Sequence, residues 1–217
     1  MKSLNLNNLK PKKLFSMGVL DLPHVGDLSR PFFITIGCSL TAGVGLEYKD
    51  TWSSLLGDRL DMEHINLSMA GSSLDYQYDT LLRAQQVLTE SRFTVWMHTY
   101  PTRFHWIKLR HILGDKLARR GIGGNLEYKP TLLKKISKLV SRTQHQNIIH
   151  TNTWGYDLKT KLAINKQICR TSNRYMLNHD DMLDYASDGS HAGPMSHHSV
   201  AVKLYGHIYR NFPRWYQ

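Results

Sequence analysis

A serine, an aspartate and a histidine in this chain have the positions that nucleophilic catalysis requires. Ser39 lies in the turn Gly37-Cys38-Ser39-Leu40-Thr41, directly after the apolar run 32–36. Asp188 and His191 lie near the other end of the chain, in Asp188-Gly189-Ser190-His191. A serine hydroxyl is a good nucleophile only when an imidazole takes its proton and a carboxylate orients that imidazole. These residues predict a triad with Ser39 as nucleophile, His191 as base and Asp188 as its orienter.

The elements around these residues should bring them to one edge of a sheet. Open parallel sheets bind ligands outside the carboxyl ends of their strands, and the run before Ser39 predicts such a strand, buried on both faces. Gly71 follows a second expected strand at 64–67, so its backbone N–H could join that of Ser39 in binding an oxyanion. Asp188 and His191 precede the last expected helix. All four residues should therefore meet at the carboxyl edge.

Strands and helices alternate along the chain. Apolar runs predict strands at 32–36, 64–67, 93–97 and 147–150. Apolar periodicity predicts a helix that is capped by Asp50 and has Trp52, Leu55, Leu56 and Leu60 on one face. A second helix is expected to begin at Ser72, which has Asp75 at capping-box spacing. Further helices are expected at 106–119, 130–143 and 196–210. This alternation predicts a three-layer α/β/α sandwich, flavodoxin-like, with a central, mostly parallel sheet. Residues 1–30 are expected to form an N-terminal extension and residues 31–217 a single domain.

Three sequence blocks resemble those of the SGNH, or GDSL-like, hydrolase family. Gly37–Thr41 is similar to its Gly-Asp-Ser-Leu turn, with Cys38 in place of the aspartate, Asn66–Gly71 is similar to its second block, and Asp188–His191 matches its final Asp-x-x-His. The resemblance covers residues from about 32 to 210. It implies an esterase with the triad named above, with Gly71 as an oxyanion donor and with neither a metal ion nor an organic cofactor.

The third block departs from the family pattern. Where the family has Gly-x-Asn-Asp after the third strand, this chain has His98-Thr99-Tyr100-Pro101-Thr102-Arg103 and no asparagine. Loss of such a donor costs roughly 10²- to 10³-fold in rate, so another group should replace it. The candidates are Thr99, Tyr100, Thr102 and Arg103. The variant Pro101–Phe104 and the Gly-Cys-Ser turn are similar to bacteriophage-encoded members of the family.

Other clusters in the sequence offer weaker candidates for sites. His191, His197 and His198 lack the carboxylate spacing of a metal site, and Asp180, Asp181 and Asp184 are better read as a solvated loop. The glycine-rich segment 37–45 lacks the Gly-Lys-Ser/Thr end of a phosphate-binding loop. A further set of aromatic residues could stack on sugar rings at a cleft mouth or pack in the core: Trp96, Tyr100, Trp106, Trp154 and Tyr156.

The net charge of +11 is concentrated in one segment. Residues 103–142 contain 11 Lys or Arg and 2 Asp or Glu. Such a segment suits an anionic partner such as an acidic polysaccharide or nucleic acid, or else forms the solvated face of amphipathic helices. The chain is thus interpreted as a hydrolase of small O-acyl esters, for example O-acetyl groups on a carbohydrate, with nucleic acid less favoured as a partner. The alternative is an inactive protein of the same fold that binds an anionic glycan or nucleic acid.

The sequence also bears on the cellular setting. No apolar stretch approaches the length of a membrane span, and the first 30 residues do not resemble a signal peptide. Cys38 and Cys169 are too sparse for a disulfide framework, and Cys38 is expected to pack as a small apolar residue. A cytoplasmic protein is therefore expected, or a virion-associated one if it is phage-encoded. The oligomeric state is left open.

Overall fold

The computed structural model describes residues 24–84, 89–99, 147–152, 176–177 and 182–215. Its centre is a sheet in the order β1-β3-β2-β4-β5-β6. The strands are β1 (His24–Val25), β2 (Phe32–Ile36), β3 (Glu63–Asn66), β4 (Thr94–His98), β5 (Ile148–Asn152) and β6 (Met176–Leu177). Strand β1 is antiparallel to β3, and all the other neighbouring pairs are parallel.

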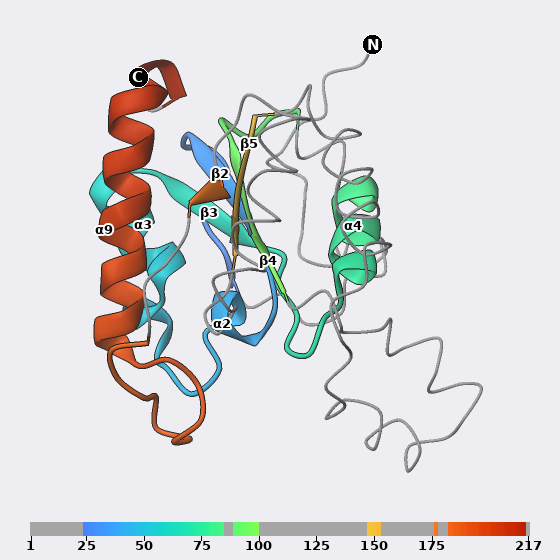
Figure 1. Cartoon of the computed structure of the whole chain (residues 1–217). Helices are drawn as coiled ribbons and strands as arrows, with labels where there is room; N and C mark the ends of the chain where they lie inside the picture. Colours follow the sequence, from blue (N-terminus) through green and yellow to red (C-terminus); the bar gives the residue numbers. More distant parts are fainter. Residues whose placement is uncertain (1–23, 85–88, 100–146, 153–175, 178–181, 216–217) are drawn as a thin grey trace, which may run out of the picture.

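Helices cover both faces of this sheet. They are α2 (Ser39–Ala42), α3 (Trp52–Leu60), α4 (Leu74–Arg83) and α9 (Pro194–Asn211), with short 3₁₀ turns at Tyr48–Asp50 and Pro213–Trp215. Helices α3 and α9 lie on one side of the sheet and α4 on the other (Figure 1). This arrangement confirms the predicted α/β/α sandwich with a mostly parallel sheet.

The main core lies between the sheet and the pair α3 and α9. All five residues of β2 are buried, as expected of a central parallel strand. The helical stripe predicted from the sequence is also confirmed, because Val200, Leu204 and Ile208 are buried against α3 and the sheet. The strands contribute Phe33, Val95, Met97 and Ile149 to this cluster, and α3 contributes Trp52, Leu56 and Leu60. Burial of this apolar surface fixes the position of β2, whose carboxyl end leads into Ser39.

The element boundaries differ from the predictions by one or two residues in several places. Strand β2 matches its predicted range, whereas β3, β4 and β5 are shifted along the chain, and α9 begins at Pro194 instead of Ser196. Helix α3 is capped by Thr51 and not Asp50, because the Thr51 hydroxyl accepts the Ser54 N–H. Helix α4 is capped by Ser73 and not Ser72. The sequence reasoning missed α2, β1 and β6.

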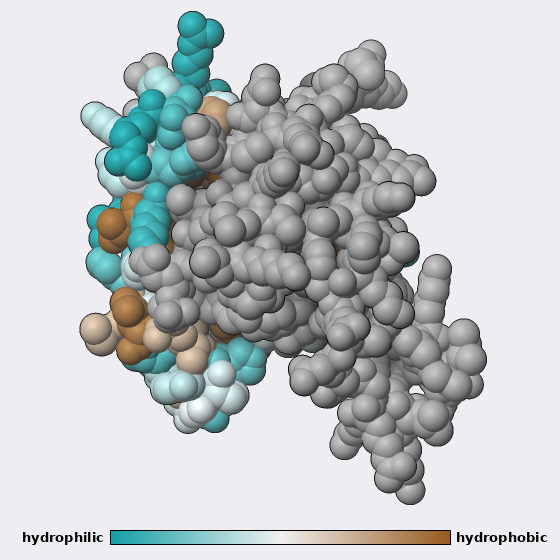
Figure 2. Space-filling model, in the orientation of Figure 1, coloured by the Kyte–Doolittle hydropathy of each residue, from teal (hydrophilic) through white to brown (hydrophobic). Residues whose placement is uncertain are grey.

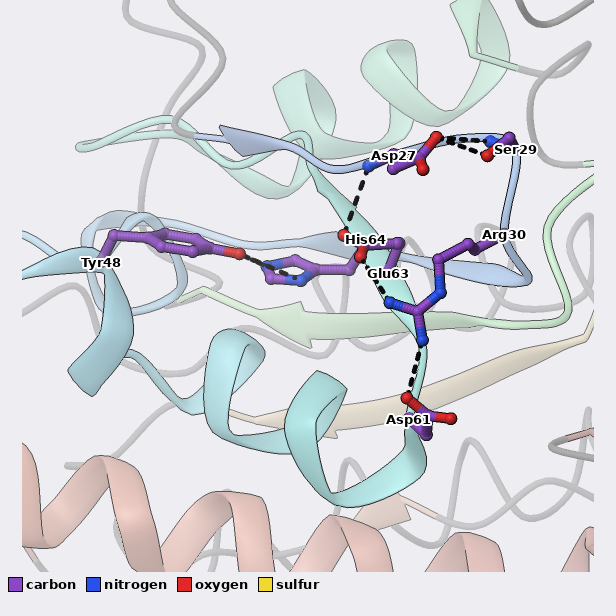
Figure 3. Close-up of polar contacts among 7 residues, drawn as sticks. All are labelled: Asp27, Ser29, Arg30, Tyr48, Asp61, Glu63 and His64. Carbon is purple, nitrogen blue, oxygen red and sulfur yellow. Dashed lines mark hydrogen bonds and ion pairs between the residues drawn. The ribbon is translucent and has the colours of Figure 1, made fainter.

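Polar contacts hold the outer edge of the sheet (Figure 3). The Arg30 guanidinium lies 2.7 Å from an Asp61 oxygen and 3.1 Å from a Glu63 oxygen, and Glu63 also accepts the Asp27 N–H. The Tyr48 hydroxyl lies 3.2 Å from Nε2 of His64. The Arg30 and Asp61 side chains are largely exposed, so their ion pair contributes little to stability.

Some predicted features fall outside the described residues. They are the helices at 106–119 and 130–143, the basic segment 103–142, and the residues Tyr100, Thr102, Arg103, Trp154, Tyr156, Cys169, Asp180 and Asp181. Within the described ranges, no helix is long and apolar enough to cross a membrane. The same part of the chain contains no cluster of three or more His, Cys, Asp or Glu side chains arranged to hold a metal ion. Figure 2 shows mainly hydrophilic residues over the outer face of α9, with hydrophobic residues near its middle and its lower end.

Candidate functional site

Ser39 begins the short helix α2 at the carboxyl end of β2. Its carbonyl accepts the Gly43 and Val44 N–H groups, so the chain turns back directly after it. Gly43 adopts a left-handed conformation with φ of 78° to close this turn. A Cβ on Gly37 would overlap the Thr41 hydroxyl, which explains why glycine precedes the buried Cys38. The sequence prediction that Ser39 follows a buried strand is confirmed.

Asp188 and His191 are held together in one turn. One carboxylate oxygen of Asp188 accepts the Ser190 and His191 N–H groups, each at 3.0 Å, and the other lies 2.5 Å from His191 Nδ1. The backbone N–H groups of His191 and Ser190, and then the imidazole, lower the pKa of Asp188 below its usual range. An ionised carboxylate keeps the proton on Nδ1, which leaves Nε2 of a neutral His191 as the basic nitrogen.

The loop with Asp188 contacts the turn that follows Ser39. The Gly45 carbonyl accepts the Ser187 hydroxyl at 2.7 Å and the Ser187 N–H at 3.3 Å. A Cβ on Gly45 would lie 3.2 Å from Cγ of Asp188, and its φ of 83° also favours glycine. In Figure 1, α2 and the loop before α9 lie toward the same end of the molecule. Among the described residues, no hydrogen bond joins Ser39 Oγ to His191, a contact that often tightens only when substrate binds.

Gly71 lies in a turn that is attached to the serine turn. The Asn66 amide donates to the Thr41 carbonyl at 2.7 Å, and the Met69 N–H donates to the Gly37 carbonyl at 3.3 Å. Gly71 is exposed and has φ of 75°. Within the described part of the chain, the N–H groups of Ser39 and Gly71 have no hydrogen-bond acceptor. Two backbone donors are therefore available beside the serine turn.

The third oxyanion donor stays a prediction. Thr99 directly follows β4 and is fully buried. The other three candidates, Tyr100, Thr102 and Arg103, lie outside the described residues.

Asp184 and His197 fix the loop that carries Asp188 and His191. The Asp184 carboxylate accepts the Met195 and Ser196 N–H groups at 2.9 and 2.8 Å, so it caps α9 and is not part of a solvated acidic run. His197 Nδ1 accepts the Trp52 N–H at 2.9 Å and thereby joins α9 to the first turn of α3. Burial lowers the pKa of His197 to about 4. His198, at the next position of α9, is exposed.

A buried histidine pair was missed by sequence reasoning. His98 Nε2 lies 3.0 Å from His150 Nδ1, and both rings contact Trp96 on one face of the sheet. Burial lowers the pKa of His98 to about 3, so this imidazole is neutral. Trp96 is fully buried, which confirms a packing role for that aromatic residue. The sequence did contain a signal for this pair. Alternate residues of a strand share one face of the sheet, so His98 lies on the same face as Trp96, and polar residues such as His150 stand in a neighbouring strand.

Comparison with solved structures supports the fold. No family model matches the chain, and no curated protein sequence matches it. The esterase EstA of Pseudoalteromonas sp. superposes with a TM-score of 0.50 at 16% identity, covering 82% of this chain and 97% of EstA. A carbohydrate esterase family 2 enzyme of Corynascus thermopiles gives 0.58 at 14% identity, covering 83% of this chain and 66% of that one.

A third similar structure is the acetyl xylan esterase Est2A of Butyrivibrio proteoclasticus. Its TM-score is 0.55 at 13% identity, and the match covers 89% of this chain and 66% of Est2A. The chain therefore spans slightly less than two thirds of the two carbohydrate esterases. These matches confirm that the chain has the α/β fold of SGNH/GDSL-like esterases, the class that the sequence blocks resemble.

Proposed function

We propose that this protein is a serine esterase that removes small O-acyl groups, such as O-acetyl, from a carbohydrate. One observation carries the proposal: the Asp188 carboxylate holds Nδ1 of His191 in a loop that is bonded to the turn after Ser39. A fixed carboxylate, an oriented imidazole and a serine at a strand end are the parts of an activated nucleophile. Two backbone N–H groups without a described acceptor, those of Ser39 and Gly71, supply oxyanion donors.

The proposed reaction has two steps. Ser39 Oγ attacks the ester carbonyl while His191 Nε2 takes the hydroxyl proton, and the negative oxygen is bound by the N–H groups of Ser39 and Gly71. His191 then gives the proton to the departing alcohol, which leaves an acyl group on Ser39. A water molecule attacks this acyl-enzyme with His191 again as base. The carboxylic acid departs and the proton returns to Ser39.

The substrate class rests on the similar structures. Est2A is an acetyl xylan esterase, and a family two carbohydrate esterase of Clostridium thermocellum, with a TM-score of 0.53 at 13% identity, was solved in complex with cellohexaose. A carbohydrate that carries O-acetyl groups fits this group of folds. The basic segment 103–142 would favour a substrate that also carries negative charge, because opposite charges accelerate encounter.

The test combines a covalent probe with hydrolysis of an activated acetate ester. A fluorophosphonate should label Ser39 in the wild type, and labelling should be lost in Ser39→Ala and in His191→Ala. Hydrolysis should fall by roughly 10⁶-fold in Ser39→Ala. The matched control is Ser29→Ala, which removes an exposed serine before β2, at the opposite end of that strand. Full hydrolysis by a folded Ser39→Ala variant would refute the proposal.

A second candidate function is binding of an anionic polymer without turnover. The charge of residues 103–142 and the absence of the family's third-block asparagine favour it. It predicts binding to an acidic polysaccharide that weakens steeply with salt, and no labelling of Ser39. Labelling of Ser39 together with salt-independent or absent binding would exclude it.

A further inference from the structure

A buried chain of hydrogen bonds leads from the sheet to the serine turn. The Trp96 indole N–H donates to the Gln77 side-chain oxygen at 2.8 Å, and the Gln77 amide donates to the Ser72 hydroxyl at 3.1 Å. The Ser72 hydroxyl donates to the Gly37 carbonyl at 2.9 Å. Trp96 and Gln77 are fully buried and Ser72 is 2% exposed. The chain therefore joins β4 and α4 to the backbone two residues before Ser39.

The Gly37 carbonyl holds both ends of the turn that contains Gly71. It accepts the Met69 N–H at 3.3 Å as well as the Ser72 hydroxyl, and the Ser72 N–H closes the turn on the Met69 carbonyl at 3.1 Å. Gly71 occupies the third position with positive φ, as in a type II turn. The position of the Gly71 N–H relative to Ser39 is thus set through Gly37.

Ser72 is not needed to cap α4. Ser73 performs that role, since its hydroxyl accepts the Tyr76 N–H. Helix α4 lies on the opposite side of the sheet from α3 and α9 (Figure 1), and its Gln77 contacts the sheet through Trp96. A buried amide is costly unless its groups are bonded, and the two bonds of Gln77 run to the sheet and to Ser72. These contacts connect α4 to the serine turn and give Ser72 a role outside the helix.

We propose that Ser72 and Gln77 are positioning residues that fix the turn Met69–Ser72 on Gly37, and with it the spacing between the N–H groups of Gly71 and Ser39. This inference rests on the proposed function, in which these two N–H groups bind the oxyanion. An oxyanion donor acts only within about 2.7–3.1 Å of the developing charge. A small displacement of the turn should therefore lower kcat and leave substrate binding nearly unchanged.

The experiment uses Ser72→Ala and Gln77→Met in the full chain. Each should lower kcat for an activated acetate ester by roughly 10- to 100-fold, part of the cost of losing a whole donor, with KM within about twofold of the wild type. The matched control is Thr80→Val, which removes a buried hydroxyl on α4 that donates to the Tyr76 carbonyl of its own helix. Its kcat should stay within about twofold. All rates are measured well below the melting temperature of each variant.

Amide hydrogen exchange supplies a readout that needs no activity. The Met69 N–H should lose protection in Ser72→Ala and in Gln77→Met, whereas the Leu67 N–H, bonded to the Thr35 carbonyl at 2.8 Å, should keep it. If Ser39→Ala inactivates the enzyme but kcat is unchanged in both Ser72→Ala and Gln77→Met, the inference is overturned and the proposed function stands. A wild type without hydrolysis would overturn the proposed function. In that case hydrogen exchange of the Met69 N–H is the sole test of the positioning role. Unchanged protection of this N–H in both variants would refute it.

Discussion

His197 makes the junction between α9 and α3 sensitive to acid. Its Nδ1 accepts the Trp52 N–H at 2.9 Å, which only an unprotonated nitrogen can do. The side chain is 1% exposed, and burial is the main reason that the pKa falls from 6.5 to about 4. The Asp184 carboxylate opposes this fall and His191 adds to it. The native state therefore holds His197 neutral at pH values where an unfolded chain would protonate it.

The sign of the effect follows from proton binding. Between pH 6.5 and pH 4 the unfolded state carries the proton and the native state does not, so the free energy of unfolding falls as the pH falls. The contribution is complete above pH 6.5 and is lost on acidification toward pH 4. A difference of 2.5 pKa units, at about 1.4 kcal/mol for each unit, amounts to about 3 kcal/mol. That is a large share of the stability of an ordinary domain.

The assay is urea unfolding at several pH values between 7 and 4.5, with His197→Asn as the variant. Asparagine keeps an oxygen acceptor for the Trp52 N–H and does not titrate. The wild type should lose about 2–3 kcal/mol more than the variant over this range. His198→Asn, an exposed change at the next position of α9, is the matched control and should follow the wild type. Parallel curves for the wild type and His197→Asn would refute the reasoning.

Three further predictions concern the loop before α9 and its contact with the turn after Ser39. Asp188→Asn should lower kcat roughly 10³- to 10⁴-fold with a small change in melting temperature, because an amide no longer selects the His191 tautomer; unchanged kcat would contradict the triad. Gly45→Ala should cost roughly 1–2 kcal/mol for its positive φ and also lower kcat, since the new methyl would press on Ala186 and Asp188; thermal unfolding and kinetics measure both. Asp184→Ala should destabilise the protein by roughly 1–3 kcal/mol in urea unfolding, whereas removal of a purely solvated carboxylate would change nothing measurable.

The sequence was informative where local chemistry and burial agree. The nearly all-apolar run 32–36 favoured a parallel strand buried on both faces, and all five residues of β2 are buried. The Asp188 turn is also local, because the N–H groups of Ser190 and His191 in the same turn donate to the Asp188 carboxylate. In each case the interacting groups lie within a few residues of one another.

Other features depend on partners that are distant in the sequence. Ser72 has the spacing of a helix cap, yet its hydroxyl is drawn to the Gly37 carbonyl by the packing of α4 against the sheet. Asp184 reads as one of several acidic loop residues, but the loop folds back onto the first turn of α9. The buried pair His98 and His150 exists only because β4 and β5 are neighbours in register.

The sequence by itself determined which residues could form a triad and that a strand should present Ser39 at its carboxyl end. It also predicted the layered fold, because apolar periodicity reports which face of each element is buried. The tertiary structure decided how those residues are held: through the Gly45 carbonyl for the Asp188 loop, and through the Gly37 carbonyl for the turn with Gly71. Every residue has a backbone carbonyl, so the sequence does not indicate which carbonyls accept side-chain hydrogen bonds. Only the folded structure shows which donors bind to each of them.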